Sequence, residues 1–248
     1  MKAKVCVITA ARSDYGPLRW TMSSLKDDPA FDFKLIVTGS HLSPEYGFTY
    51  REIEKDGFKP DFKIEMLLSS DSSIGIAKSM GLCIIGMADA LDRISPNCIV
   101  VLGDRYELLS ICSTALVMKI PIVHISGGDV TTGAIDNEIR NAISQMADFH
   151  FPSTQASAKR LIGMGIPENK IMVVGEPGLD NFNRLSLLNR EEVAKELGLD
   201  PHKKWILLTY HPETKINTAE NIHILKDLID VIIFETDAQI IATYANAD

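Results

Sequence analysis

The stretch CIVVLGDRYE, residues 98–107, decides the class of fold. Its first five residues are apolar and largely β-branched, and turn-forming residues flank them, so they predict a buried strand at Cys98–Leu102. A glycine ends this run, and Asp104 and Arg105 follow at once. Ligands of open α/β sheets bind outside the carboxyl ends of the strands, which makes both residues candidates for a functional site. The alternative is that Asp104 caps the next helix and Arg105 is solvated.

Similar apolar runs alternate with amphipathic segments along the chain. The expected strands are Lys4–Thr9, Phe33–Thr38, Phe62–Met66, Cys98–Leu102, Ile120–His124, His150–Pro152, Ile171–Val174, Trp205–Thr209 and Gln239–Thr243. The expected helices are Leu18–Lys26, Ile74–Ile94, Leu108–Met118, Asp136–Met146, Ala156–Met164 and Arg190–Leu197. Apolar strands joined by helices indicate an α/β fold with a parallel sheet covered on both faces.

A domain boundary is expected after Gly175–Gly178, where glycine and proline interrupt the pattern. Residues 1–182 would form one domain of ordinary size. Beyond a polar helix, residues 183–248 hold only a strand, a helix and a strand, too few elements to cover both faces of a sheet. We therefore expect a second domain that begins here and is incomplete at Asp248.

The composition excludes several classes of protein. The 248 residues carry a net charge of −8, with 46% apolar and 23% charged residues, a balance typical of globular proteins. No Lys/Arg-rich run is present, so nucleic acid is not an expected partner. No signal peptide is recognisable and no apolar stretch approaches the ~20 residues of a membrane span, so we expect a cytoplasmic protein with no membrane partner. The four cysteines lack the paired spacing of metal ligands, so no metal site is expected.

The segment Thr9–Gly16 follows the first expected strand, where dinucleotide-binding folds carry the pattern GxGxxG. The glycines of that pattern are absent, so a nicotinamide or flavin dinucleotide is not expected. Arg12 and Ser13 could instead bind a phosphate through the guanidinium group and the N–H groups at a helix N-terminus. The sequence equally allows Ser13 to cap that helix and Arg12 to be solvated.

The densest polar cluster is SGGDVTTGAIDNEIR, residues 126–140, which follows another expected strand. Its paired glycines let the backbone approach a ligand closely. Asp129 has no local partner in the sequence, which favours a functional role. Asp136 and Arg140 are four residues apart, so this pair could simply stabilise a helix.

A histidine follows the first strand of the second expected domain, in the segment His211–Thr214. Pro212 restricts the backbone beside it. His211 could face the first domain across a cleft from this position, which favours a functional role. His41, in contrast, is expected to be an ordinary loop residue.

Five segments carry a family resemblance when taken in order: Arg12–Gly16, Gly103–Glu107, His124–Asp129, Asp136–Arg140 and His211–Thr214. Together they resemble the hydrolysing UDP-N-acetylglucosamine 2-epimerases of sialic-acid and related nonulosonic-acid synthesis. The resemblance covers essentially the whole chain. It implies two Rossmann-like domains in a glycosyltransferase-B-like arrangement, the second incomplete in this chain. It also implies a homo-oligomer, dimer or tetramer, that needs no metal or redox cofactor.

The resemblance implies a reaction in which UDP leaves C1 of UDP-N-acetylglucosamine and a proton leaves C2. Water then adds to the resulting 2-acetamidoglucal from the other face and gives N-acetylmannosamine. The implied catalytic carboxylates are Asp104, Asp129 and Asp136. The implied substrate-binding residues are Arg12, Asp14, Arg105, Arg140 and His211, with Arg12 and His211 near the diphosphate. Many relatives have glutamate where this chain has Asp129, and crowded carboxylates would raise one another's pKa.

Other functions share some of these features. A type B glycosyltransferase would have the same fold and could use a strand-end acid as its base. A non-catalytic nucleotide-sugar-binding module is a second alternative. Within the family, the substrate could be a UDP-linked 2,4-diacetamido sugar or a GDP-linked sugar.

Overall fold

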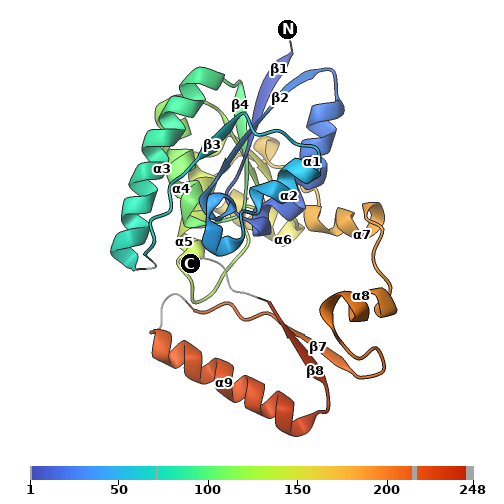
Figure 1. Ribbon diagram of the computed structural model, residues 1–248. Coiled ribbons are helices and arrows are strands. Elements are labelled where there is room, and N and C mark those ends of the chain that lie inside the picture. The colour runs from blue at the N-terminus through green and yellow to red at the C-terminus, as the bar shows by residue number, and fades with distance from the viewer. Residues whose placement is uncertain (1, 71, 214–216, 244–248) are drawn as a thin grey trace. The chain divides into compact units, whose positions relative to one another are not determined.

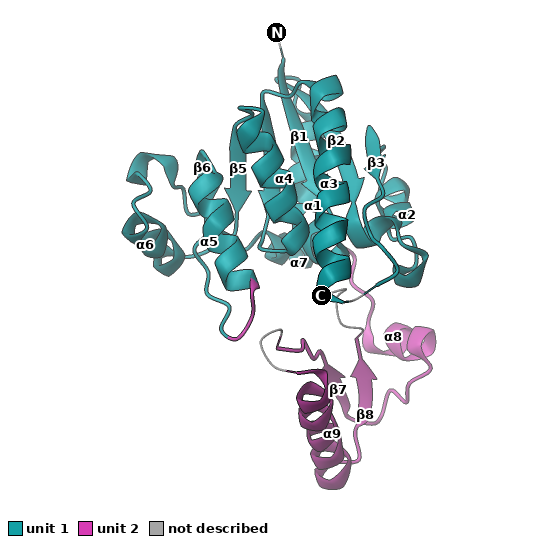
Figure 2. Ribbon diagram, turned by 90° about the vertical axis from the view of Figure 1, so that its left-hand side faces the viewer, with its two compact units in different colours: residues 1–132, 136–183 teal, residues 133–135, 184–248 magenta. Residues whose placement is uncertain are grey.

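The computed structural model describes residues 2–70, 72–213 and 217–243. The chain divides into two compact units, which are described separately (Figure 2). Unit 1 comprises residues 1–132 and 136–183, and unit 2 comprises residues 133–135 and 184–248.

Unit 1 is built on a six-stranded sheet in the order β3-β2-β1-β4-β5-β6 (Figure 1). Its strands are β1 (Ala3–Thr9), β2 (Phe31–Thr38), β3 (Phe62–Ile64), β4 (Cys98–Leu102), β5 (Ile122–Ile125) and β6 (Phe149–Phe151). Every neighbouring pair is parallel. The strand order reverses between β1 and β4, and open parallel sheets bind ligands at the carboxyl ends of the strands beside such a reversal.

Helices cover both faces of this sheet. They are α1 (Arg12–Asp27), α2 (Tyr50–Lys55), α3 (Ser73–Ile94), α4 (Tyr106–Val117), α5 (Asp136–Met146) and α6 (Gln155–Gly163), with short turns at η1 (Gly39–Leu42), η2 (Pro44–Tyr46), η3 (Glu168–Lys170) and η4 (Pro177–Leu179). Alternate residues of a strand point to opposite faces. Cys6 and Ile8 of β1 therefore pack with α3, α4 and α5, while Val5 and Val7 pack with α1 and α2.

Several elements of unit 1 differ from the sequence prediction. Helix α2 was not predicted, and β3 ends at Ile64 and not at Met66. The expected strand Ile171–Val174 forms only one bridge, between Ile171 and His150, before Gly175 turns with φ +85°. Helix α1 begins at Arg12, six residues before the predicted start at Leu18. Pro17 lies in the second turn of α1 and has no N–H group to donate to the carbonyl oxygen of Ser13, yet the helix continues to Asp27.

Helix α3 is the one helix among the described residues that is long and apolar enough to cross a membrane by length and composition. The expectation that no apolar stretch approaches that length is therefore wrong. Core helices of water-soluble proteins pass the same test. One side of α3 packs against the sheet through Cys83, Met87 and Leu91, which are fully buried.

Unit 2 contains a two-stranded parallel sheet of β7 (Trp205–Leu208) and β8 (Gln239–Ala242). Helix α8 (Arg190–Leu197) precedes it and α9 (Thr218–Glu235) joins its strands, while α7 (Asp180–Arg184) connects the two units in sequence. The guanidinium group of Arg190 lies 3.8 Å from the centroid of the Trp205 ring. The predicted strand, helix and strand are thus present in this part of the chain.

Candidate active site

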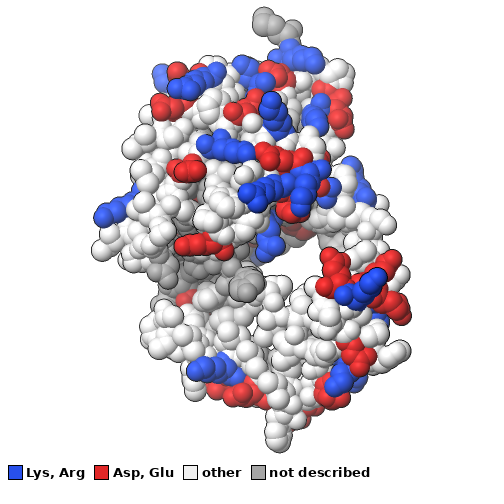
Figure 3. All heavy atoms as spheres, in the orientation of Figure 1, with Lys and Arg blue, Asp and Glu red and all other residues white. Residues whose placement is uncertain are grey.

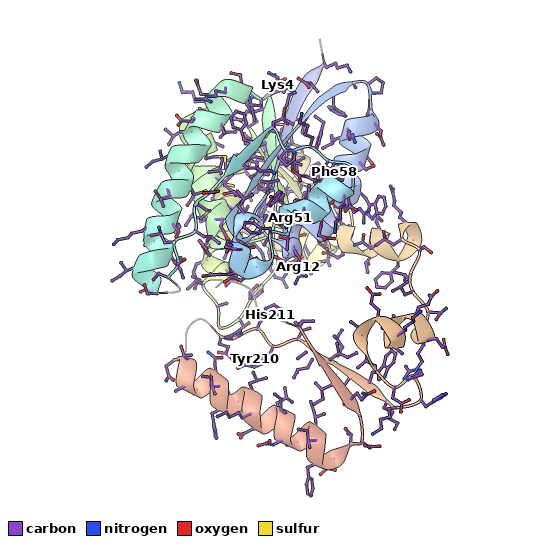
Figure 4. All side chains as sticks on the ribbon, viewed as in Figure 1. Lys4, Arg12, Arg51, Phe58, Tyr210 and His211 are labelled. Atoms are coloured by element: carbon purple, nitrogen blue, oxygen red, sulfur yellow. The ribbon has the colours of Figure 1, made fainter. Side chains whose placement is uncertain are left out.

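Polar residues of unit 1 gather in the turns that follow β1, β4 and β5. Arg12 is the first residue of α1, directly after β1, and its side chain is exposed (Figure 4). Asp104 follows β4, and Asp129 follows β5. Parallel strands end at the same edge of a sheet, so these turns flank the position where the strand order reverses.

Asp104 is held by residues from two other segments. The Nη2 group of Arg140, on α5, donates a hydrogen bond to Oδ2 of Asp104 and forms an ion pair with it. Thr131 Oγ1 donates to the same oxygen at 3.5 Å and accepts from Arg140 Nη1 at 3.1 Å. A neighbouring guanidinium group favours the ionised form of a carboxyl group. Arg140 therefore does more than stabilise its own helix, and it gives Asp104 a counter-charge.

The alternative role predicted for Asp104 and Arg105 is wrong on both counts. Arg105, not Asp104, occupies the N-cap position of α4. The Arg105 side chain is not solvated, because it is buried and pairs with the buried carboxylate of Glu107 at 2.9 Å. Arg105, which the resemblance implied as a substrate-binding residue, fixes this turn from within the protein.

His124 stabilises the turn that carries Asp104 through a hydrogen bond to the preceding residue, Gly103. Its Nε2 donates to the carbonyl oxygen of Gly103 at 2.8 Å, which leaves Nδ1 to accept from the hydroxyl group of Ser144 at 3.2 Å. A Cβ atom added at Gly127 would lie 2.9 Å from that Nδ1. Burial lowers the pKa of His124 to about 4, so the ring is neutral near pH 7. This imidazole joins the end of β4 to α5 and to the glycine turn, a role that the sequence alone did not reveal.

Asp129 is attached to the beginning of α6. Its Oδ1 accepts a hydrogen bond from the hydroxyl group of Ser157. Arg160, also on α6, donates from Nη1 to the carbonyl oxygen of Gly128 at 3.0 Å. Gly128 adopts φ +80°, and a Cβ atom there would come well inside 3.0 Å of the Ser157 carbonyl oxygen. Only glycine fits this contact without a shift of the backbone, so the loop and α6 position Asp129 together.

Asp14, which the resemblance implied as a substrate-binding residue, holds the turn after β1. It is buried, and its carboxylate accepts from Thr9 Oγ1 at 2.7 Å and from the N–H groups of Ala10 and Ala11 at 2.9 and 3.0 Å. The N-cap residue of α1 is Ala11, so the prediction that Ser13 caps the helix is wrong. Asp14 fixes the turn that presents Arg12.

His41 extends this buried network, although the sequence suggested only a loop residue. Thr9 Oγ1 donates to Asp14, so it accepts from Nε2 of His41 at 2.9 Å. The Nδ1 atom then accepts from Thr49 Oγ1 at 2.7 Å. Burial lowers the pKa of His41. The network ties the end of β1 to the segment after β2 and stiffens the turn below Arg12.

The predicted site residues still to be placed are Asp136 and His211. Asp136 is the first residue of α5 and is partly exposed. His211 follows β7 in unit 2 and is exposed (Figure 4); Thr214 of the same segment lies outside the described residues. Asn221, on α9, accepts from the hydroxyl group of Tyr210 at 2.9 Å and from the N–H group of Glu213 at 3.0 Å. Asn221 thereby braces the loop that carries His211.

A hollow of about 250 Å³ lies at the same edge of the sheet, after β2 and β3. Leu42, Phe48 and Met66 supply part of its apolar wall, and Gly39 forms another part. A Cβ atom at Gly39 would lie 3.2 Å from Oε1 of Glu107, the partner of Arg105. Gly39 therefore lies between the hollow and the buried carboxylate of Glu107. No group of three or more potential metal ligands occurs among the described residues.

We expect unit 1 to lose stability as pH falls from 6.5 towards 4. Burial lowers the pKa of His41, His124 and His150 below the ordinary 6.5, so the unfolded state binds more protons in this range. Stability present above pH 6.5 is then lost as pH falls through the folded pKa values. His124→Gln keeps a donor for the carbonyl oxygen of Gly103. Between pH 7 and 4, its free energy of unfolding should fall by about 1–3 kcal/mol less than that of the wild-type protein. Thermal unfolding between pH 7 and 4 tests this, and equal slopes for both proteins would contradict it.

Comparison with known proteins links this arrangement to one family. The sequence pattern of the family described as UDP-N-acetylglucosamine 2-epimerase matches residues 23–248. The chain is 39% identical to the GDP/UDP-N,N'-diacetylbacillosamine 2-epimerase (hydrolyzing) of Campylobacter jejuni, over 100% of this chain and 64% of that protein. It is 34% identical to the UDP-N,N'-diacetylbacillosamine 2-epimerase (hydrolyzing) of Legionella pneumophila, over 100% of this chain and 65% of that protein.

The fold matches the crystal structure of UDP-GlcNAc 2-epimerase from Neisseria meningitidis bound to UDP-GlcNAc. The TM-score is 0.79 at 19% sequence identity, over 97% of this chain and 66% of that chain. The predicted α/β class is therefore confirmed. The chain spans about two thirds of the length of these three proteins.

Proposed function

Because the chain belongs to the UDP-N-acetylglucosamine 2-epimerase family, we propose that the whole protein hydrolyses a UDP-linked 2-acetamido sugar and inverts its configuration at C2. The observation that carries this proposal is the carboxylate of Asp104, held by Arg140 and Thr131 at the strand reversal. A positioned carboxylate of this kind can act as a general acid or base.

The chemistry begins when the bond between C1 and the diphosphate oxygen breaks, and UDP leaves with the electron pair. Positive charge at C1 then acidifies the hydrogen on C2, and a carboxylate removes it to form the C1=C2 double bond of a 2-acetamidoglucal. Addition of water returns a hydroxyl group to C1 and a proton to C2 from the opposite face. Asp104, Asp129 and Asp136 are the proposed acids and bases.

The diphosphate needs positive groups and N–H donors. Arg12 is exposed at the N-terminus of α1, where helix N–H groups and the helix dipole favour an anion. We assign it to the diphosphate together with His211, which Asn221 positions through its loop. Asp14 and Arg105 act indirectly, because both are buried and fix the turns beside Arg12 and Asp104.

For the sugar, we favour a substrate with two N-acetyl groups over UDP-N-acetylglucosamine. The names of the Campylobacter and Legionella relatives support this choice. The hollow after β2 and β3 also supports it, because Leu42, Phe48 and Met66 offer apolar surface to an additional acetyl methyl group.

The reaction path predicts complete incorporation of solvent label. In deuterated water, the full-length protein should release a sugar with deuterium at C2, and in oxygen-18 water the label should enter C1 of the sugar and not UDP. NMR and mass spectrometry of the products from UDP-N-acetylglucosamine and from the UDP-linked diacetamido sugar provide the measurement. Retention of the original C2 hydrogen would exclude elimination.

The same assay separates the alternatives. A glycosyltransferase would require an acceptor before it released UDP, whereas the proposed enzyme needs only water. A binding module would bind the nucleotide sugar without turnover. A faster reaction with UDP-N-acetylglucosamine than with the diacetamido sugar would overturn the substrate assignment and leave the reaction class intact.

A further inference from the structure

Asp129 is held in a different way from Asp104. On the face of the molecule in Figure 3, many of the exposed carboxylates lie beside lysine or arginine side chains, and Asp104 likewise pairs with Arg140. Asp129 forms no ion pair with another residue in the described part of the chain, and its Oδ1 atom accepts from the neutral hydroxyl group of Ser157. The Asp129 carboxylate is therefore fixed without a counter-charge.

The hydroxyl group of Ser157 is itself oriented by a neighbour. A hydroxyl group has one proton and an ionised carboxylate only accepts, so the Ser157 proton points to Asp129. The Ser157 Oγ atom therefore accepts from Thr154 Oγ1, which lies 2.6 Å away. Thr154 is the N-cap residue of α6, and its Oγ1 atom accepts from the N–H group of Ser157 at 3.1 Å. The two hydroxyl groups thus donate in one direction, towards Asp129, and such bonds strengthen one another.

Ser157 has little freedom to move. It is 1% exposed and lies in the first turn of α6. Its carbonyl oxygen packs against Gly128, where a Cβ atom would collide with it. Arg160, one turn further along α6, donates to the carbonyl oxygen of Gly128 at 3.0 Å. The residue before Asp129 and the side chain of Asp129 are thus attached to the same helix.

The second oxygen of Asp129 is left for another partner. Within the described part of the chain, Oδ1 receives the only hydrogen bond to this carboxylate, and the Asp129 side chain is partly exposed. A carboxylate that moves a proton must stay in place through one oxygen and offer the other to the reacting group. The contacts of Asp129 meet both requirements.

We propose that Ser157 is a positioning residue of the active site: its hydroxyl group, oriented by Thr154, fixes the side-chain rotamer of Asp129 and keeps Oδ2 directed at the substrate. This inference rests on the proposed function, in which Asp129 is one of the acids and bases. A hydroxyl group holds a carboxylate without neutralising it, whereas an arginine in its place would weaken the attraction of the carboxylate for a proton. The arrangement therefore suits a group that takes up a proton and returns it.

Ser157→Ala tests this role in the full-length protein. Without the hydroxyl group, Asp129 can occupy other staggered rotamers. Turnover should fall by roughly 10- to 100-fold while KM changes little, because a misplacement of about 1 Å costs up to 100-fold in rate. Ser110→Ala is the matched control, since Ser110 is also a 1% exposed serine in a helix, α4. The control should turn over substrate like the wild-type protein, and circular dichroism checks that both variants are folded.

Thr154→Asp tests the direction of the hydrogen bonds without creating a cavity. Aspartate caps a helix as well as threonine does, so the melting temperature should be maintained. An ionised carboxylate has no proton to donate, however, and it would compete with Asp129 for the proton of Ser157. Turnover should fall by about 10-fold. Gln155→Glu is the control for the added charge, because Gln155 is exposed in the same turn, and it should retain the wild-type rate.

A double variant separates this inference from the proposed function. Asp129→Asn should lower turnover by about 10²–10⁴-fold, and Ser157→Ala should cause no further loss in that background because Ser157 acts through Asp129. Turnover by Asp129→Asn close to the wild-type rate would overturn the role of Asp129 and, with it, the inference. If Asp129→Asn is impaired, three results would overturn the inference alone: Ser157→Ala as fast as Ser110→Ala, Thr154→Asp as fast as Gln155→Glu, or additive losses in the double variant.

Discussion

Asp104→Asn should lower turnover of the UDP-sugar by about 10²–10⁴-fold, the usual contribution of a general acid or base. Asparagine has nearly the same shape and still offers an oxygen to Arg140 and Thr131, so the turn after β4 should persist. The variant should therefore retain most of its affinity for UDP and its thermal stability. Initial rates at saturating substrate, with UDP binding measured by calorimetry, separate the loss of chemistry from a loss of binding.

Asp27→Asn supplies a matched control for this experiment. Asp27 is an exposed aspartate at the end of α1, away from the strand-end turns, and it should leave turnover unchanged. If Asp104→Asn turned over substrate at a rate close to that of this control, the role of Asp104 would be limited to holding the turn with Arg140.

Gly128→Ala should destabilise unit 1 strongly. The new Cβ atom would collide with the Ser157 carbonyl oxygen and lie 2.9 Å from Cγ of Leu161, so the backbone of the Asp129 loop or of α6 must move. Overpacking of this kind costs about 1–3 kcal/mol, in addition to about 1–2 kcal/mol for an L-residue at positive φ. Chemical denaturation monitored by circular dichroism measures the sum.

Gly165→Ala isolates the two contributions. Gly165 has φ +88°, close to the +80° of Gly128, but no atom lies within 4 Å of its Cβ position. The control should therefore show only the cost of the backbone conformation, and Gly128→Ala should be less stable than it by about 1–3 kcal/mol. Equal stability of the two variants would mean that the loop and α6 are not closely packed.

Local sequence patterns predicted the architecture because they encode burial directly. The apolar run at Cys98–Leu102 became a strand with the predicted bounds, and the helix predicted at Asp136–Met146 also has those bounds. The family resemblance is confirmed by the match over residues 23–248. Ile171–Val174 lies beside β6, where the N–H groups of Met172 and Val174 donate to the carbonyl oxygens of His150 and Pro152, but it forms only one bridge before Gly175 turns the chain away.

The site was predictable as a set of positions but not as a set of contacts. Strand-end logic indicated Asp104 and Asp129, since both directly follow the sheet. The ion pair of Asp104 with Arg140 joins residues 36 positions apart, so no local spacing in the sequence predicts it. The same holds for the buried carboxylate of Asp14 and for His124, whose roles depend on tertiary neighbours. The residue types thus predicted which chemical groups the site contains. Whether a given residue is buried behind the site or exposed in it depended on tertiary packing.

The strand order of unit 1 also has a consequence for synthesis of the chain. Strand β1 is made first, and β2 follows closely, but its other neighbour β4 begins at Cys98, which pairs with Val5. A ribosome adding about 5–20 residues per second needs roughly 5–20 s to cover that distance. During this time the apolar edge of β1 has no permanent neighbour, so the nascent sheet is exposed to pairing with other chains. One of the two central strands of the finished unit is therefore the one that waits longest for its second neighbour, and a chaperone would protect the sheet most during this interval.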